Sequence, residues 1–146
     1  TEGASTSVAR ADHTHQITTL KTASARASVS DTTGTTSATY VGLVNPVTLN
    51  FTKQRADTAL LIRYEGGIQS DDGLGQWEAG VNVGGTDHYI ANSFSTALAS
   101  GTLLLTGLAA GVHTCTLRKR RANAVGSVPD GFVGTVNCLT VTEVYV

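Results

Sequence analysis

The residues best suited to metal chemistry are His13 and His15, which stand two apart in the stretch DHTH. In an extended backbone, side chains at i and i+2 project from the same side, about 6.5–7 Å apart, so both imidazoles face one way. One chain then supplies two nitrogen ligands, and a structural zinc site needs about four. Three copies around an axis would supply six, which suits an octahedral iron, nickel or cobalt ion. The alternative is that both histidines are solvated in a flexible segment.

Two aromatic residues, Trp77 and Tyr89, lie just beyond glycine-rich stretches. Aromatic rings exposed beside loops can stack on a sugar, so the segments 66–76, 84–87 and 121–133 are candidate receptor-binding loops. The alternative is that these aromatics belong to the core, where tryptophan is highly buried on average. We therefore mark Trp77 and Tyr89 as candidate contacts to a host-surface glycan and leave the core interpretation open.

A third histidine and the two cysteines form another set of candidates. Strand alternation places His113, Cys115 and Leu117 on one face, which favours a hydrogen-bonded core histidine over a Cys/His catalytic pair. If the last two strands form a hairpin, Cys115 and Cys138 fall near one rung, either as a disulfide or as two small buried side chains. No nucleophile–base–acid set and no paired carboxylates stand out, so we expect no enzyme.

Charged residues form two further groups. The run RKRR, residues 118–121, is either an anion contact or a solvated rim that offsets acidic neighbours. Asp71, Asp72 and Glu78 offer oxygen ligands to a cation. They lack the alternating ligands of an EF-hand loop, and an Asp-Gly turn is the alternative. Neither group therefore defines a site from the sequence alone.

Composition limits the classes of function. The chain has 146 residues, which is typical of one domain with a substantial core. Only 14% of its residues are charged and the net charge is −1, so it lacks the basic field of a general nucleic-acid binder. No segment approaches a run of about 18 apolar residues, so we expect no membrane insertion.

The elements that must position these residues are strands. Residues 1–33 are rich in Thr, Ser and Ala, and they predict an extended N-terminal leader with too little apolar surface to fold alone. Residues 34–146 predict a β-sandwich, jelly-roll-like, because short alternating segments recur between turn signals. The expected strands are 38–44, 47–53, 58–65, 76–83, 87–91, 102–107, 112–120 and 135–146.

Two stretches carry a resemblance to a known class of protein. SVARADHTHQ, residues 7–16, resembles stretches that recur in bacteriophage tail and fibre proteins. The segment 103–144, from LLLTGLAAGVHT to CLTVTEV, resembles C-terminal β-sandwich segments of phage virion proteins. In trimeric phage fibres, His-x-His segments hold iron along the trimer axis. The resemblance thus implies His13 and His15 as ligands, and it places Asp12 where it can hydrogen-bond an imidazole.

The resemblance implies a structural virion protein of a tailed phage, as a tail-fibre, collar or spike component. Such a protein would be a homotrimer that is assembled in the host cytoplasm and contacts other virion proteins through its N-terminal segment. An axial transition-metal ion, iron before others, would be its cofactor. Two alternatives remain: a capsid decoration or head-fibre protein, and a glycan-binding module that recognises the host receptor.

Overall fold

The computed structural model of this chain describes residues 22–27, 35, 37–68, 76–93, 97–122 and 137–146. Regular structure in these ranges consists of β-strands, and no helix there is long and apolar enough to cross a membrane. The strands are β1 (Thr22–Ala27), β2 (Val41–Gly42), β3 (Thr48–Lys53), β4 (Thr58–Ile68), β5 (Trp77–Val83), β6 (Thr86–Ser93), β7 (Ala97–Leu105), β8 (Gly111–Arg121) and β9 (Asn137–Tyr145). The predicted all-β class is therefore confirmed.

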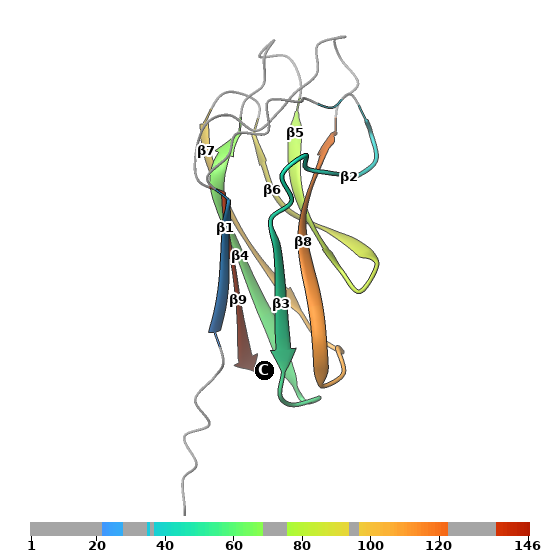
Figure 1. Ribbon diagram of the computed structural model, residues 1–146, viewed down its shortest axis with the longest axis vertical. Helices are drawn as coiled ribbons and strands as arrows, with labels where there is room; N and C mark the ends of the chain where they lie inside the picture. Colours follow the sequence, from blue (N-terminus) through green and yellow to red (C-terminus); the bar gives the residue numbers. More distant parts are fainter. Residues whose placement is uncertain (1–21, 28–34, 36, 69–75, 94–96, 123–136) are drawn as a thin grey trace, which may run out of the picture.

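The strands form two antiparallel sheets (Figure 1). The first sheet has the order β1-β9-β4-β7, and the second has the order β2-β8-β5-β6, with β3 also paired to β8. β2 and β3 lie one after the other along the same edge of β8, and the amide of Leu117 donates to the carbonyl of Val47 between them (2.9 Å). Pro46, which has no N–H, lies in the interruption. The two therefore act as one interrupted edge strand.

The pairing is nested from the ends of the chain inward. β1 pairs with β9, the interrupted β2–β3 strand with β8, β4 with β7, and β5 with β6. A long hairpin that folds over on itself gives this order, which is that of a jelly roll. The structure thus confirms the predicted β-sandwich and gives it the jelly-roll strand order.

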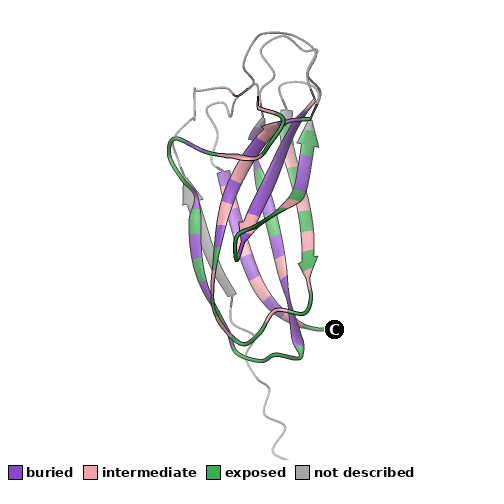
Figure 2. Cartoon of the chain, turned by 90° about the vertical axis from the view of Figure 1, so that its right-hand side faces the viewer, coloured by how far each residue is buried: buried purple, intermediate pink, exposed green. Residues whose placement is uncertain are grey.

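Side-chain alternation divides β3, β8 and β9 between core and surface (Figure 2). β3 alternates between exposed and buried residues along its whole length, and β9 alternates between buried and partly exposed ones. Each large apolar side chain that becomes fully buried stabilises the fold by about 1.5–3 kcal/mol. The fully or almost fully buried core side chains include Phe51, Leu60, Ile62, Tyr64, Trp77, Val81, Leu117, Leu139 and Val141.

β1 lies within residues 1–33, the segment expected to form the leader. It pairs with β9 from Thr22 opposite Thr142 to Ala27 opposite Asn137, and it forms an edge of the first sheet. β9 therefore has a partner on each side, β1 and β4. The sheet includes six residues that precede the expected boundary between leader and sandwich.

The last two strands do not form the hairpin that the sequence suggested. β8 belongs to the second sheet and β9 to the first, so the two strands are not paired with each other. Cys115 lies opposite Val83 in β5, whereas Cys138 lies opposite Glu65 in β4. The expectation of a shared rung is wrong for this reason, and both cysteines are free thiols.

One side of the sandwich closes where β6 and β7, edges of opposite sheets, approach each other. Gly101 in β7 lies directly against the backbone of Ile90 in β6. A methyl group on Gly101 would overlap the carbonyl oxygen of Ile90, which cannot rotate away as a side chain can. Only glycine therefore permits the observed distance between the two edges.

We predict that Gly101→Ala lowers the free energy of unfolding by about 2 kcal/mol or more, because overpacking forces the β6 and β7 backbones apart. Gly42→Ala is the matched control, since an added methyl group at Gly42 meets nothing within 4 Å. We expect that control to change stability by less than about 0.5 kcal/mol. Denaturant unfolding of both variants measures the difference, and equal stabilities would contradict the close approach.

Candidate functional site

The predicted metal ligands His13 and His15 lie outside the described residues. Within the described part of the chain, no group of three or more His, Cys, Asp or Glu side chains is placed to hold a metal ion. Asp71 and Asp72 also lie outside it. The axial metal site therefore stays a prediction that depends on the N-terminal segment.

Trp77 is a core residue. It begins β5, its exposed fraction is 0%, and it belongs to the cluster of buried apolar side chains between the sheets. A ring without an accessible face cannot stack on a sugar. The glycan-contact interpretation of Trp77 is therefore wrong, and the core interpretation describes it.

Tyr89 lies on the surface. It is 49% exposed and stands in the middle of β6, opposite Gly80 of β5. The register shifts between Ala79 and Gly80, because β6 has one extra residue, Ile90, at this point. Such a β-bulge re-aims neighbouring side chains. Of the two aromatic residues singled out in the sequence, Tyr89 is the one that a ligand can reach.

The basic run in β8 is divided between the two faces of the second sheet. Lys119 and Arg121 are buried, on the same face as Leu117, whereas Arg118 and Arg120 are partly exposed on the opposite face. The run is thus neither a solvated rim nor a continuous anion contact. Alternation leaves only two of its cations, Arg118 and Arg120, on the outer surface.

Tyr40 is held across this outer face. Its ring covers Gly80, and the guanidinium of Arg120 lies over the ring at 4.6 Å from the centroid. Its hydroxyl donates to Oε2 of Glu78 (3.2 Å), and its carbonyl accepts from Nη2 of Arg118 (3.0 Å). Burial and the adjacent charge of Glu78 raise the pKa of Tyr40 to about 12. The phenol therefore stays protonated and donates at neutral pH.

The charges around Tyr40 are paired. Arg120 Nε and Nη2 each lie 2.6 Å from Oε2 of Glu78. Arg118 Nε lies 3.7 Å from Oδ1 of Asp87, and Asn82 Nδ2 donates to the same oxygen (2.8 Å). Glu78, considered in the sequence as a cation ligand, thus pairs with a guanidinium instead.

We call this surface the Tyr89 face and define it by its members on the outer side of the second sheet. They are Tyr40, Glu78, Asn82, Asp87, Tyr89, Arg118 and Arg120. They come from the segment before β2 and from β5, β6 and β8. The face offers an accessible ring, hydrogen-bond donors and carboxylate acceptors, and groups of these kinds can contact a ligand.

His113 and Cys115, the candidate base and nucleophile, make contacts that do not prepare them for catalysis. Nε2 of His113 lies 2.9 Å from the carbonyl oxygen of Ala109. Burial raises the pKa of the Cys115 thiol to about 11, so the thiol is protonated at neutral pH. His113 and Cys115 lie on one face of β8 as expected, but His113 is only partly buried, so the expected core position is wrong for it.

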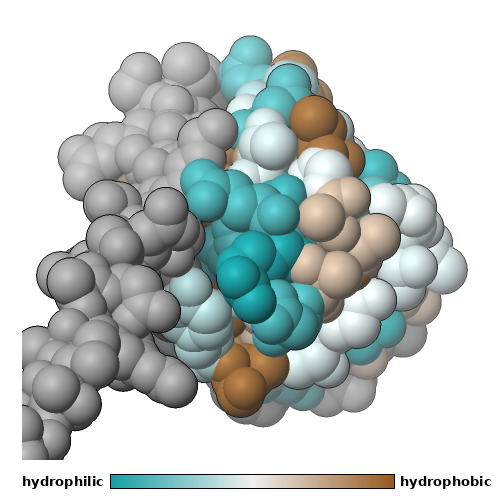
Figure 3. Space-filling view, turned by 90° about the horizontal axis from the view of Figure 1, so that it is seen from below, coloured by the Kyte–Doolittle hydropathy of each residue, from teal (hydrophilic) through white to brown (hydrophobic). Residues whose placement is uncertain are grey.

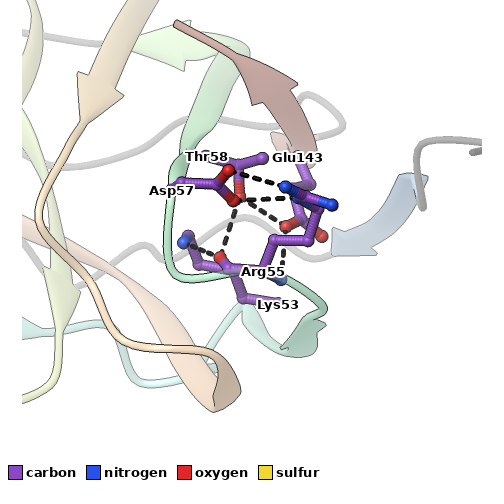
Figure 4. Close-up of polar contacts among 5 residues, drawn as sticks. All are labelled: Lys53, Arg55, Asp57, Thr58 and Glu143. Atoms are coloured by element: carbon purple, nitrogen blue, oxygen red, sulfur yellow. Dashed lines mark hydrogen bonds and ion pairs between the residues drawn. The ribbon is translucent and has the colours of Figure 1, made fainter.

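Glu143 is a buried carboxylate near the end of β9, and the sequence alone did not single it out (Figure 4). Glu143 of β9 accepts hydrogen bonds from the amides of Gln54 (2.8 Å) and Arg55 (3.0 Å) in the turn between β3 and β4. It also accepts one from the hydroxyl of Thr58 (2.5 Å). The signal was present, because Glu143 continues the inward alternation of Leu139 and Val141.

The hydrogen bonds control the ionisation of Glu143. Burial raises the pKa of Glu143, but the bonds from Thr58, Gln54 and Arg55 outweigh it, so the pKa lies below its ordinary value of 4.5. In the same turn Lys53, also buried, donates to the carbonyl of Arg55. We interpret this cluster as a structural cap, because the three hydrogen bonds to Glu143 join β9 to the β3–β4 turn and to the first residue of β4.

Comparison with known proteins adds no relative: a scan against protein-family models finds no match, and a search of curated proteins finds none either. The candidate site is therefore defined by its own contacts.

We predict that Gly80→Ala and Tyr40→Ala are coupled. A methyl group on Gly80 would overlap the Tyr40 ring, so Gly80→Ala alone should cost about 1–3 kcal/mol of stability. In a Tyr40→Ala background the same change should cost less than about 0.5 kcal/mol, because the obstacle is gone. A double-mutant cycle by denaturant unfolding measures this, and additive effects would show that Tyr40 does not lie over Gly80.

We also predict that Glu143 contributes to stability in a pH-dependent way. Its pKa is lower folded than unfolded, so its contribution is complete above the ordinary value of 4.5 and is lost as the pH falls through the folded value. Glu143→Gln should cost about 1–3 kcal/mol at neutral pH. It should also flatten the loss of stability between about pH 5 and pH 3.

Asp57→Asn is the matched control for this measurement. The pKa of Asp57 is also lowered, chiefly by its hydrogen bond with Arg55, but that pair is exposed to solvent. We therefore expect Asp57→Asn to change the free energy of unfolding much less than Glu143→Gln, both at neutral pH and in acid. Unfolding curves across pH compare the variants, and a Glu143→Gln profile parallel to the wild type would contradict the cap.

Proposed function

We propose that this chain is a structural virion component of a tailed phage, in a tail fibre, collar or spike, and that it functions as a homotrimer. The jelly-roll fold and the two sequence resemblances support the proposal. Viral capsid proteins and lectins are among the proteins that use this fold, but fold alone assigns no function. The observation that carries the proposal is the position of β1.

Thr22, the first residue of β1, lies opposite Thr142 near the end of β9. The chain therefore enters the first sheet at the end of the sandwich where β9 finishes, and Figure 1 shows the C-terminus at this end. In three copies side by side, the segments that carry His13 and His15 would start from equivalent points around one axis. Six imidazoles could then hold an octahedral ion, and we propose iron.

The same end offers a surface for contact with other copies or other virion proteins. Tyr145 and Val146 are exposed there, at 56% and 73%. Arg55 lies over the Tyr145 ring at 5.9 Å and also pairs with Asp57. Figure 3, seen from this end, shows hydrophilic side chains gathered in the middle and hydrophobic ones apart from them. A mixed surface of this kind is typical of non-obligate protein contacts.

Glycan recognition is a second candidate function, and the exposure of Tyr89 favours it. It is compatible with a fibre or spike, since both can be part of host attachment. A capsid decoration protein would share the fold and the trimer. Imaging of the particle separates these positions, because it shows whether the density lies on the tail or on the capsid.

We predict that the purified chain has a mass in solution of three times its own 15.1 kDa and carries about one iron per three chains. His13→Ala combined with His15→Ala should abolish the metal. His88→Ala, a histidine within β6, is the control and should retain it. Native mass spectrometry with element analysis makes both measurements. A metal-free monomer would contradict the proposal.

A further inference from the structure

Tyr89 is an exposed ring in the interior of a strand, with polar groups around it. Its register partner Gly80 has no side chain, and the Tyr40 ring covers that glycine. Two aromatic residues thus lie on one face, separated by a strand position without a side chain. The Tyr89 residue is 49% exposed although it lies in the interior of β6. The ring is accessible to an external partner.

Asp87 lies two residues before Tyr89 and therefore projects from the same face of β6. Asn82 and Arg118 both contact its oxygen Oδ1, at 2.8 and 3.7 Å. Asn82 is itself oriented, because its Oδ1 accepts from the amide of Gly85 (3.2 Å). Within the described residues these contacts leave Oδ2 of Asp87 as an available acceptor beside the ring. The side chains of Asp87 and Arg118 are each 30% exposed.

The charge balance indicates the kind of ligand. Arg118 is matched by Asp87 and Arg120 by Glu78, so the four charges of the face cancel. A nucleic acid or a strongly acidic glycan needs unmatched cations, and this face offers none among its defined members. The ligand that fits is uncharged and rich in hydroxyl groups.

The surroundings of the face favour a sugar over a protein partner. The outer side of β3 and β8 continues with hydroxyl and amide side chains, in the pairs Thr48–Thr116 (3.3 Å) and Asn50–Thr114 (2.9 Å). A protein interface of useful affinity needs a central apolar anchor region surrounded by a rim. On the outer side of these two strands Val112 is the exposed large apolar side chain (70%), and its register partner is Thr52, so they provide no such apolar region.

We propose that the Tyr89 face binds a neutral saccharide, with one sugar ring stacked on Tyr89. Sugar hydroxyls accept from Arg118 and donate to Oδ2 of Asp87. The inference rests on the proposed role in host attachment for the source of the saccharide. The site itself lies within one chain, so it needs neither the trimer nor the metal. Because the proposed contacts are one stacked ring and a few hydrogen bonds, we expect weak binding for a single sugar, with a Kd on the order of 1 mM.

The test uses the full chain on an array of neutral and acidic oligosaccharides, followed by titration with the neutral oligosaccharide that binds best. Tyr89→Ala should weaken binding at least tenfold, and Asp87→Ala should weaken it by a similar factor. Leu98→Ala is the control, because Leu98 is an exposed apolar side chain of β7 in the other sheet (81%), and the change should leave binding unchanged. Unfolding curves establish that each variant is folded.

Three outcomes would overturn the inference: no neutral saccharide binds, only acidic ones bind, or binding is unchanged in Tyr89→Ala. The titration is repeated with the variant that lacks His13 and His15. Saccharide binding that persists in that variant while trimer and metal are lost supports the site and shows that it does not need the assembly. An unaltered chain that binds the saccharide as a metal-free monomer supports the site and contradicts the assembly. A metal-loaded trimer without saccharide binding contradicts the site and leaves the assembly supported.

Discussion

Side-chain alternation along β8 is the constraint on which both the core and the candidate site depend. Cys115 and Leu117 face the interior, where the strand contributes to the packing between the sheets. Arg118 and Arg120 face outward and hold Tyr40, Glu78 and Asp87. A register slip of one residue would exchange these two sets of side chains. The strong apolar burial of the inner set therefore fixes the position of the outer one.

The nested pairing gives the N-terminal segment a structural role besides the proposed assembly. β1 covers an edge of β9 that would otherwise present unpaired backbone groups to solvent. Glu143 joins the end of the same strand to the turn between β3 and β4. β9 is thus held by a neighbour on each side and by a cap at its end. Among the described strand pairs, only β5–β6 joins strands that follow each other in the sequence, which makes the fold depend on long-range contacts.

The sequence predicted the strands well because alternation and turn residues are local signals, as in β3 and in the Gly84-Gly85 turn. Both glycines of that turn have positive φ, 61° and 89°, as a two-residue hairpin requires. Strand pairing was harder, because the connection from β8 to β9 gives no local sign that it changes sheets. Trp77 and Tyr89 looked alike beside glycine-rich loops, and only the direction of each side chain separated them. Glu143 was missed because its donors lie about 85–89 residues away.

The most direct test of the two-sided arrangement of β8 is residue-level chemical modification of the native protein, read out by mass spectrometry. An arginine-selective dicarbonyl and a lysine-selective acylating reagent would label the run of basic residues 118–121. The account predicts that Arg118 and Arg120 react in the folded protein, whereas Lys119 and Arg121 react only after unfolding. Equal reactivity of Arg120 and Arg121 in the native state would contradict it.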